Sequence, residues 1–367
     1  MKQIPCIDLK EQTQLLKEDV LKAVSAVFDE AAFSGGPFVE TFEKEFAEFL
    51  NCSYFAGVSN GSDALFLALR GLGVKPGDQV IVPANTFIAT AFAVQRLGAE
   101  PVFADCDPYT WQIDPNSVRE CITDKTVGII GVHLYGQLFP VKEILEIADE
   151  AGLFLVEDCA QSQGALYEGK AAGTFGDAGC FSFYPTKNLG AFGEAGGVAS
   201  ANLALDERIK RMRAQGSRVR YCHEELGFNM RMDGIQAAVL SVKLKHLKDW
   251  NARRSQIWSA YRTGICNDRL IMQKELPHTT PAWYLAVVCV DDRERFLQHM
   301  EKQGVHCGVH YAVPCHLQEA MAELGYKNGD CPVAEWQAAH CVSLPLYPEM
   351  DDTAVDQVIC ACNCYEG

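Results

Sequence analysis

Lys187 stands between two stretches of very different character. A run of apolar residues, 180–184, precedes it, and a glycine-rich segment, 190–197, follows it. An amine that is held on such a turn and partly desolvated can form a Schiff base with a carbonyl cofactor or substrate. A lysine in a surface loop would have a similar setting, so this stretch alone leaves both interpretations open.

Two neighbouring carboxylates, Glu157 and Asp158, end another apolar run, 153–159. Because successive side chains of a strand point to opposite faces, only one of the two can face a ligand cleft. A buried carboxylate costs free energy unless a cation or a donor meets it. The protonated pyridine nitrogen of pyridoxal phosphate is such a cation, and an aspartate beside it keeps the ring an electron sink. We therefore expect Asp158 at that nitrogen and Gln161 at the ring's phenolic oxygen.

Other residues could hold the phosphate and the ring of such a cofactor. Gly61 and Ser62 open a predicted helix, whose free N–H groups and dipole favour an anion. An ordinary helix cap would have the same sequence. Phe87 could stack on a flat ring, although a core aromatic residue is an equally good interpretation. Ser182, five positions before the lysine, offers a hydroxyl group to a phosphate.

The elements that must position these residues alternate between strand and helix. Apolar runs predict seven strands, at 54–59, 79–84, 101–106, 127–135, 153–159, 178–184 and 196–201. Helical patterns cover 11–33, 38–50, 62–72 and 86–97. Continuous apolar strands are typical of a mostly parallel sheet with helices on both faces. Such sheets bind ligands beyond the carboxyl ends of their strands, where the candidate residues stand.

The pattern changes after about residue 249. A long polar helix is expected at 251–265, a strand at 284–290 and a helix at 293–304. We therefore predict a large domain at 1–250, with an N-terminal helical segment, and a smaller α+β domain at 251–367.

Charge and composition exclude several classes of protein. The 367 residues include 32 Lys and Arg against 48 Asp and Glu, a net charge of −16 that disfavours nucleic acid as a partner. No stretch has the length of a membrane span and the start has no apolar signal segment, so we expect a cytoplasmic protein. The chain has 16 cysteines, and in a reducing compartment scattered ones such as Cys52, Cys106, Cys159 and Cys289 behave as small core residues. Cys360, Cys362 and Cys364 lack the C-x-x-C spacing of zinc sites, and we predict no metal.

Several motifs together carry a resemblance to a known family. They are FSGGPFVETFEKEFAEFL at 33–50, SNGSDALFLALRGLGV at 59–74, VEDCAQSQGA at 156–165, FSFYPTKNLGAFGEAGG at 181–197 and ELGFNMRMDGIQAAVL at 225–240. In order and spacing the chain is similar to the DegT-type nucleotide-sugar aminotransferases, pyridoxal phosphate enzymes of the aspartate aminotransferase fold (fold type I). The resemblance implies a three-layer α/β/α domain and a homodimer whose active site lies between the subunits.

The same resemblance implies roles for individual residues. Lys187 matches the lysine that holds the cofactor, Asp158 the partner of the ring nitrogen, and Gln161 the neighbour of the ring oxygen. Phe87 matches the stacking aromatic residue. The phosphate group is matched by Gly61, Ser62, Ser182 and by Asn229, which reaches it from the partner subunit. Asp63 departs from the serine that many relatives carry.

The sugar is suggested by the subgroup. Relatives that aminate the 4-position often have histidine three residues before the lysine, where this chain has Tyr184. Together with RVRYCHEELGFN and GVHYAVPCHLQ, this is similar to 3-aminotransferases of dTDP-3-oxo-6-deoxyhexoses. A UDP-linked 3-oxo sugar and a 4-aminotransferase remain alternatives. The resemblance implies sugar-nucleotide contacts by Tyr184, Arg220, Tyr221, His223, His310 and Tyr311.

The implied reaction is a transamination with L-glutamate as amino donor, as in the biosynthesis of deoxyamino sugars of lipopolysaccharide or other glycans. A dehydratase of the same family would carry histidine in place of Lys187. A regulator that binds cofactor and sugar without turnover is the alternative from another class. A sensor of this kind is expected to carry a DNA-binding segment, and the sequence has no basic helix-turn-helix pattern at either end.

Overall fold

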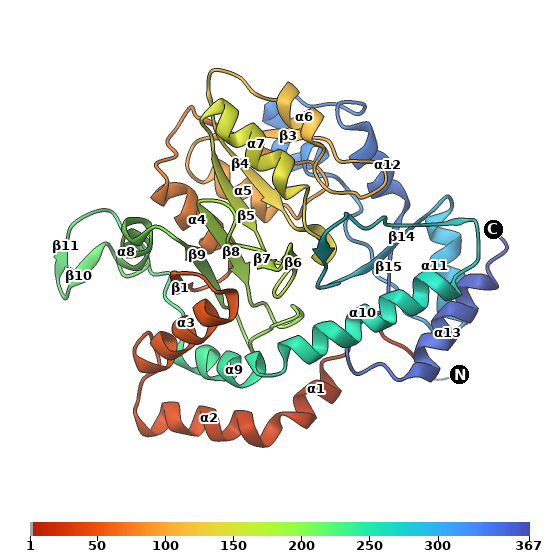
Figure 1. Cartoon of the computed structure of the whole chain (residues 1–367), viewed down its shortest axis with the longest axis horizontal. Coiled ribbons are helices and arrows are strands. Elements are labelled where there is room, and N and C mark those ends of the chain that lie inside the picture. The colour runs from red at the N-terminus through yellow and green to blue at the C-terminus, as the bar shows by residue number, and fades with distance from the viewer. Residues whose placement is uncertain (1–2) are drawn as a thin grey trace.

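The computed structural model describes residues 3–367, and a seven-stranded sheet lies at its centre (Figure 1). Its order is β1 (Tyr54–Val58), β9 (Gly196–Ser200), β8 (Ala178–Ser182), β5 (Phe154–Asp158), β4 (Thr126–Val132), β2 (Gln79–Pro83) and β3 (Glu100–Ala104). Only β9 runs antiparallel to its neighbours in this sheet. The predicted α/β class with a mostly parallel seven-stranded sheet is therefore confirmed.

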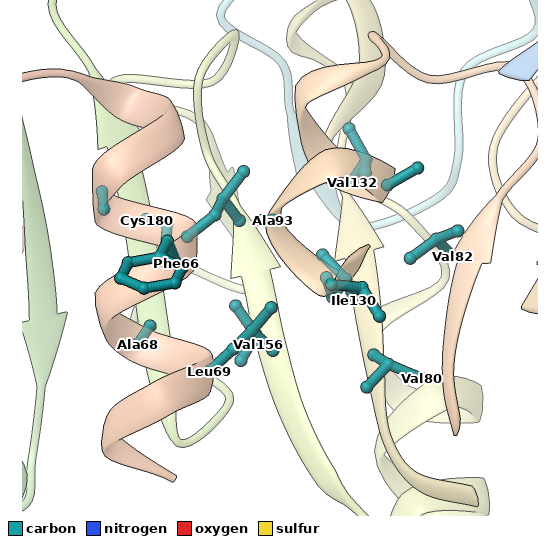
Figure 2. Close-up of a cluster of buried hydrophobic side chains, with 14 of the residues drawn as sticks. Phe66, Ala68, Leu69, Val80, Val82, Ala93, Ile130, Val132, Val156 and Cys180 are labelled. Carbon is teal, nitrogen blue, oxygen red and sulfur yellow. The ribbon is translucent and has the colours of Figure 1, made fainter. Parts of the chain in front are cut away.

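Alternate residues of each strand feed two hydrophobic cores, one on each face of the sheet. Val80 and Val82 of β2 pack in the core beneath α4 (Gly61–Gly71), α5 (Ala89–Gln95) and α8 (Leu203–Met212). Figure 2 shows Phe66 and Leu69 of α4 in this cluster. Ile81 joins the opposite core, beneath α3 (Pro37–Leu50), α6 (Pro115–Glu120), α7 (Val141–Ala151) and α9 (Gly234–Leu244). Because both faces are covered, the strands are apolar throughout.

Three helix predictions differ from the structure by three residues or more. The helix expected at 251–265 begins four residues earlier, as α10 (Leu247–Gly264). The helix expected at 11–33 is two helices, α1 (Lys10–Leu15) and α2 (Lys17–Asp29), because the backbone of Leu16 leaves helical geometry. The helix expected to start at Thr86 begins at Ala89 as α5. Residues 84–88 instead form a turn after β2, which places Phe87 at the carboxyl ends of the strands.

The C-terminal part is built on a smaller antiparallel sheet. Its strands are β12 (Leu270–Met272), β14 (Ala286–Val290) and β15 (Cys341–Leu344). Helices α11 (Arg293–Lys302) and α13 (Asp352–Asn363) share a core with this sheet. The long helix α10 (Leu247–Gly264) runs obliquely from beside α9 toward α11 and so reaches both parts (Figure 1). The predicted division of the chain near residue 250 falls inside this helix and stays a prediction.

The remaining elements are short. They are α12 (Pro332–His340), the strands β6 (Leu166–Tyr167), β7 (Lys170–Ala171) and β13 (Thr279–Thr280), and the 3-10 turns η1 (Leu134–Gly136), η2 (Cys315–Leu317) and η3 (Glu319–Leu324). Strands β10 (Ser217–Val219) and β11 (Cys222–His223) form a hairpin that projects from the molecule beyond α8 (Figure 1).

All sixteen cysteines lie within the described residues and are free thiols. Cys106, Cys159 and Cys289 are buried, as expected for small core residues, whereas Cys52 is only half-buried. In the part of the chain that the structure describes, no helix is both long and apolar enough to cross a membrane.

Candidate active site

A cavity of about 450 Å³ opens at the carboxyl ends of the parallel strands. It brings together residues from the ends of β4, β5 and β8, from the segments that follow β1 and β2, and from the C-terminal part. Its lining includes Asn60, Gly61, Ser62, Thr86, Phe87, Val132, Asp158, Gln161, Ser182, Tyr184, Thr186, Lys187, Glu194, Tyr284, His310 and Tyr311. Most of the predicted site residues therefore share one cavity.

Lys187 is half-buried on a tight loop that follows β8. Its backbone N–H donates to the Tyr184 carbonyl oxygen at 2.9 Å. The loop leaves no room for a side chain at Gly190, where a Cβ atom would lie 2.3 Å from the carbonyl oxygen of Pro185. The Lys187 ammonium lies 4.2 Å from the centre of the Tyr284 ring. It makes no ion pair with residues 3–367, so the amine is held beside a ring and free to react with a ligand.

Asp158 is the buried carboxylate that faces the cavity. Its Oδ2 accepts a hydrogen bond from Thr90 Oγ1 at 2.8 Å, and its Oδ1 accepts one from the Ala160 N–H at 3.1 Å. Burial raises the pKa of this carboxyl, and the two hydrogen bonds offset part of that effect. Among residues 3–367 no cation pairs with it. A cationic ring nitrogen in the cavity would supply the missing partner, so the site fits pyridoxal phosphate.

Glu157 points to the opposite face of β5, as strand alternation requires. Its carboxylate accepts the backbone N–H groups of Gly173, Phe175 and Gly176 and contacts His133 Nε2 at 2.9 Å. His133, Glu157 and Cys159 also lie close enough together to hold a metal ion. Because four partners already occupy the Glu157 carboxylate, we interpret His133, Glu157 and Cys159 as a structural cluster in which Glu157 holds the loop at 173–176 in place.

Gln161 and Tyr311 form one wall of the cavity. Gln161 Oε1 accepts the N–H of Tyr135 at 2.6 Å, and Nε2 donates to the Tyr311 hydroxyl at 3.1 Å. The rings of Phe87 and Tyr311 lie 5.5 Å apart. The exposed face of Phe87 is therefore available to a planar ligand at the mouth of the cavity.

His310 is a neutral group on the same wall. Its Nδ1 contacts Ser343 Oγ at 2.8 Å. Burial, with a smaller contribution from the charge of Lys187, lowers the pKa of His310 to about 4. The imidazole therefore offers a neutral polar surface to a ligand at neutral pH.

The start of α4 forms the anion-binding end of the cavity. The first N–H groups of a helix have no partner within the helix. Asn60 caps α4 by accepting one of them, the Asp63 N–H, at 2.8 Å, and the N–H groups before it can bind a ligand. Gly61 lies so close to β8 that a Cβ atom would meet Ser182 Cβ at 2.6 Å. Asp63 lies outside the cavity lining and pairs with Arg96 at 3.0 Å. A phosphate would therefore meet the helix end and the Ser182 hydroxyl.

Four predicted site residues lie outside the cavity of their own chain. Arg220, Tyr221 and His223 belong to the projecting β10–β11 hairpin, and Asn229 follows it; all four are exposed. Asn229 Oδ1 accepts a hydrogen bond from Arg231 at 2.8 Å. Their roles toward a ligand need a second chain and stay predictions.

Several residues of the site are not among those that the sequence predicts. Thr86 follows β2 in NTFIAT and Glu194 precedes β9 in the glycine-rich return, and these positions beside strand ends are a signal that could have identified both. Thr90 lies in the first turn of α5 and reaches the site through Asp158. Tyr284 and Thr186 lie side by side at 3.3 Å between hydroxyl oxygens. No pattern near Tyr284 indicates that it reaches Lys187.

Comparison with known proteins places this fold and site in a family. The profile of the DegT/DnrJ/EryC1/StrS aminotransferase family matches residues 14–363. The chain belongs to this family, as the resemblance of its motifs predicted. It is a nucleotide-sugar aminotransferase, and the predicted enzyme class is confirmed.

Its relatives differ in the sugar that their names give. The chain is 42% identical over 360 residues to the erythromycin biosynthesis sensory transduction protein EryC1 of Saccharopolyspora erythraea, covering 97% of this chain and 98% of the relative. It is 40% identical to dTDP-3-amino-3,4,6-trideoxy-alpha-D-glucose transaminase of Streptomyces venezuelae, covering 97% and 94%. It is 36% identical to UDP-N-acetyl-3-dehydro-alpha-D-glucosamine 3-aminotransferase of Acidithiobacillus ferrooxidans, covering 97% and 96%.

Solved structures agree with the fold over nearly the whole chain. S. venezuelae DesV, crystallised with a ketimine intermediate, superimposes with a TM-score of 0.97 at 39% identity, covering 99% of this chain and 98% of DesV. NtdA from Bacillus subtilis, with bound cofactor PMP, gives a TM-score of 0.90 at 30% identity, covering 99% and 85%. PMP is the aminated form of pyridoxal phosphate, and the predicted cofactor is thereby confirmed for the family.

Proposed function

We propose that this protein transfers the amino group of L-glutamate to the 3-position of a dTDP-3-oxo-6-deoxyhexose, giving a dTDP-3-amino-3,6-dideoxyhexose. The observation that carries the proposal is that Lys187, Asp158 and the start of α4, an anion-binding helix end, all line one cavity. When bound there, pyridoxal phosphate supplies a carbonyl group for amine exchange and a ring that takes up electrons.

Each residue of the cavity would have its own role in the reaction. Lys187 Nζ would hold the cofactor at rest, and once released it would serve as the base and acid that moves the proton at the reacting carbon. Asp158 would keep the ring nitrogen protonated. Phe87 would cover one face of the ring and Gln161 would meet its oxygen. Gly61, Ser62 and Ser182 would bind the phosphate through N–H and hydroxyl groups.

The 3-position is supported by Tyr184, which lies at the cavity where 4-aminating relatives often carry histidine. Its ring is 47% exposed and is available to a sugar. His310 and Tyr311 would contact the sugar or its nucleotide from the C-terminal part. Since dTDP- and UDP-named relatives are about equally similar, a UDP-linked 3-oxo sugar is the second candidate substrate.

The active unit proposed here is a homodimer with shared sites. The hairpin presents apolar side chains to solvent in the single chain: Val219 and Leu226 are each 67% exposed and Tyr221 is 80% exposed. Burial of such a surface against a second copy would stabilise a dimer. It would also bring Asn229 to the phosphate, and Arg220 and His223 to the nucleotide, of the partner's cavity. We place this dimer in the cytoplasm, without nucleic acid or membrane as partner.

A regulator that binds without turnover is the candidate from another class. One relative, at 42% identity, bears the name of a sensory transduction protein. Lys187 would hold the cofactor in either case, so turnover is the property that separates the two functions.

One assay separates these functions. The purified protein is supplied with pyridoxal phosphate, L-glutamate and either dTDP- or UDP-linked 3-oxo or 4-oxo hexoses, and 2-oxoglutarate is measured. We expect turnover that is fastest with the dTDP-linked 3-oxo-6-deoxyhexose and abolished by Lys187→Ala. Cofactor binding without turnover on any of these sugars would favour the regulator.

A further inference from the structure

Two buried threonines stand behind Asp158 in a chain of hydroxyl groups. Thr90 Oγ1 donates to Asp158 Oδ2 at 2.8 Å, and Thr86 Oγ1 lies 3.1 Å from Thr90 Oγ1. Thr90 is fully buried and Thr86 is 3% exposed, so neither is an incidental surface contact. Both threonines come from the segment between β2 and the first turn of α5, whereas Asp158 ends β5.

The chemistry of the groups fixes the direction of this chain. An ionised carboxylate only accepts hydrogen bonds, so Thr90 must use its single proton toward Asp158. The oxygen of Thr90 can then accept the proton of Thr86. Each hydroxyl thus points its proton toward the carboxylate, and the alignment strengthens the hydrogen bond that reaches it.

We propose that Thr90, oriented by Thr86, is a positioning residue that keeps Asp158 ionised and fixed for the ring nitrogen of the cofactor. This inference rests on the proposed role of Asp158. A carboxylate and a pyridine nitrogen share one proton, and donors to the carboxylate favour the form in which the nitrogen carries it. The threonine pair therefore sets how strongly the ring can take up electrons.

The hydroxyl acts together with the backbone. The Ala160 N–H donates to the other carboxylate oxygen, Oδ1, at 3.1 Å. With one donor on each oxygen, rotation of the carboxylate about its bond to Cβ would break a hydrogen bond. The remaining lone pairs of Asp158 are left for a ligand on the cavity side.

The test uses Thr90→Val, which keeps the shape of the side chain and removes its hydroxyl, and Thr90→Ser, which keeps the hydroxyl. Apoprotein is titrated with pyridoxal phosphate, and the visible absorbance of the bound cofactor is followed against pH. We expect about tenfold weaker cofactor binding and a displaced pH profile for Thr90→Val, since a hydrogen bond to a charged group is lost. Thr90→Ser should restore both, and Thr86→Val should have a smaller effect in the same direction.

Thr126→Val is the matched control, because Thr126 is a buried threonine that lies outside the cavity lining. Its hydroxyl oxygen accepts the backbone N–H of Thr123 at 2.9 Å, so this variant also loses a hydrogen bond. Thermal unfolding of each variant shows whether it is folded. The inference is overturned if folded Thr90→Val binds the cofactor with wild-type affinity and pH profile, or if Thr126→Val changes them equally. Asp158→Asn separates the two proposals: if it leaves cofactor binding and the pH profile unchanged, the assignment of Asp158 itself is wrong.

Discussion

The ammonium group of Lys187 lies 4.2 Å from the centre of the Tyr284 ring, although the two residues are 97 positions apart in the sequence. The ring attracts the cation through its negative face and also limits the space in which the amine can move. The Tyr284 hydroxyl adds a contact with Thr186 at 3.3 Å, one residue before the lysine. Tyr284 thus holds the lysine and its loop from the C-terminal part.

Replacing Tyr284 with leucine should slow the attachment of pyridoxal phosphate to Lys187. The ring limits where Nζ can move, and loss of a contact of about 1 kcal/mol corresponds to a change of roughly fivefold in the population of correctly placed lysine side chains. Rapid mixing of apoprotein with the cofactor, followed by absorbance, measures the rate. Tyr284→Phe is the matched control and should remain within about twofold of the wild type, because it keeps the ring. Equal slowing of both variants would show that the hydroxyl, and not the ring, matters.

Replacing Gly61 with alanine should weaken binding of the cofactor phosphate. The new Cβ atom would lie 2.6 Å from Ser182 Cβ, so the start of α4 must move away from β8. Overpacking of this kind typically costs about 1–3 kcal/mol. Titration with pyridoxal phosphate and urea unfolding measure the two effects. The double variant Gly61→Ala with Ser182→Gly removes the shortest contact, to Cβ, and should recover part of the stability, although the contact to the Cα atom of residue 182 at 3.2 Å remains. No recovery at all would point to the helix start itself.

Glu194 should influence which sugars the cavity accepts. It lines the cavity and makes no hydrogen bond or ion pair with residues 3–367. A sugar nucleotide with an additional carboxylate on the sugar would be repelled by it, whereas a 6-deoxyhexose would not. We expect Glu194→Gln to raise kcat/KM for the acidic 3-oxo sugar relative to the neutral one by about tenfold, equivalent to ~1.4 kcal/mol. An unchanged ratio would show that Glu194 does not face the sugar.

His310 should make the apoprotein less stable as the pH falls. Its pKa is about 4 in the folded chain against an ordinary value of 6.5, so the unfolded chain takes up this proton first. The contribution of His310 is fully present above pH 6.5 and is lost as the pH falls toward 4, by up to about 3 kcal/mol.

Urea unfolding at a series of pH values in that window measures this loss. The variant His310→Asn should lose less stability between pH 6.5 and pH 4 than the wild type. Part of the effect should also disappear in Lys187→Ala, because the lysine charge contributes to the low pKa of His310. Parallel curves for all three proteins would contradict the assignment.

Much of the sheet domain could be predicted because its strands are buried on both faces. The run 79–84 is one residue longer than β2 at one end, and the run 153–159 is one residue longer than β5 at each end. Their polar neighbours, including Asp158, stand at strand ends that a parallel sheet must bring together. The lysine loop could also be predicted, since Gly190 has no room for a side chain.

The rest of the site depends on contacts between distant segments. The sequence predicts only that Tyr284 begins a strand, at 284–290. The position of its ring over Lys187 depends on how the C-terminal part packs on the sheet. Leu16 has no proline or glycine beside it, and yet its backbone divides the predicted first helix in two. The predicted roles of the hairpin residues follow only from the resemblance to relatives, and a single chain does not bring these residues to its own cavity.

The projecting hairpin has a consequence for genetics. If each cavity is completed by the hairpin of the other subunit, a chain damaged at Lys187 and a chain damaged at Arg220 and Asn229 would compensate for each other. In a mixed pair, one of the two sites would combine the intact lysine of one copy with the intact hairpin of the other. When the two inactive variants are expressed together, each mixed dimer would then have about half the activity of a wild-type dimer. Either variant expressed alone would be inactive.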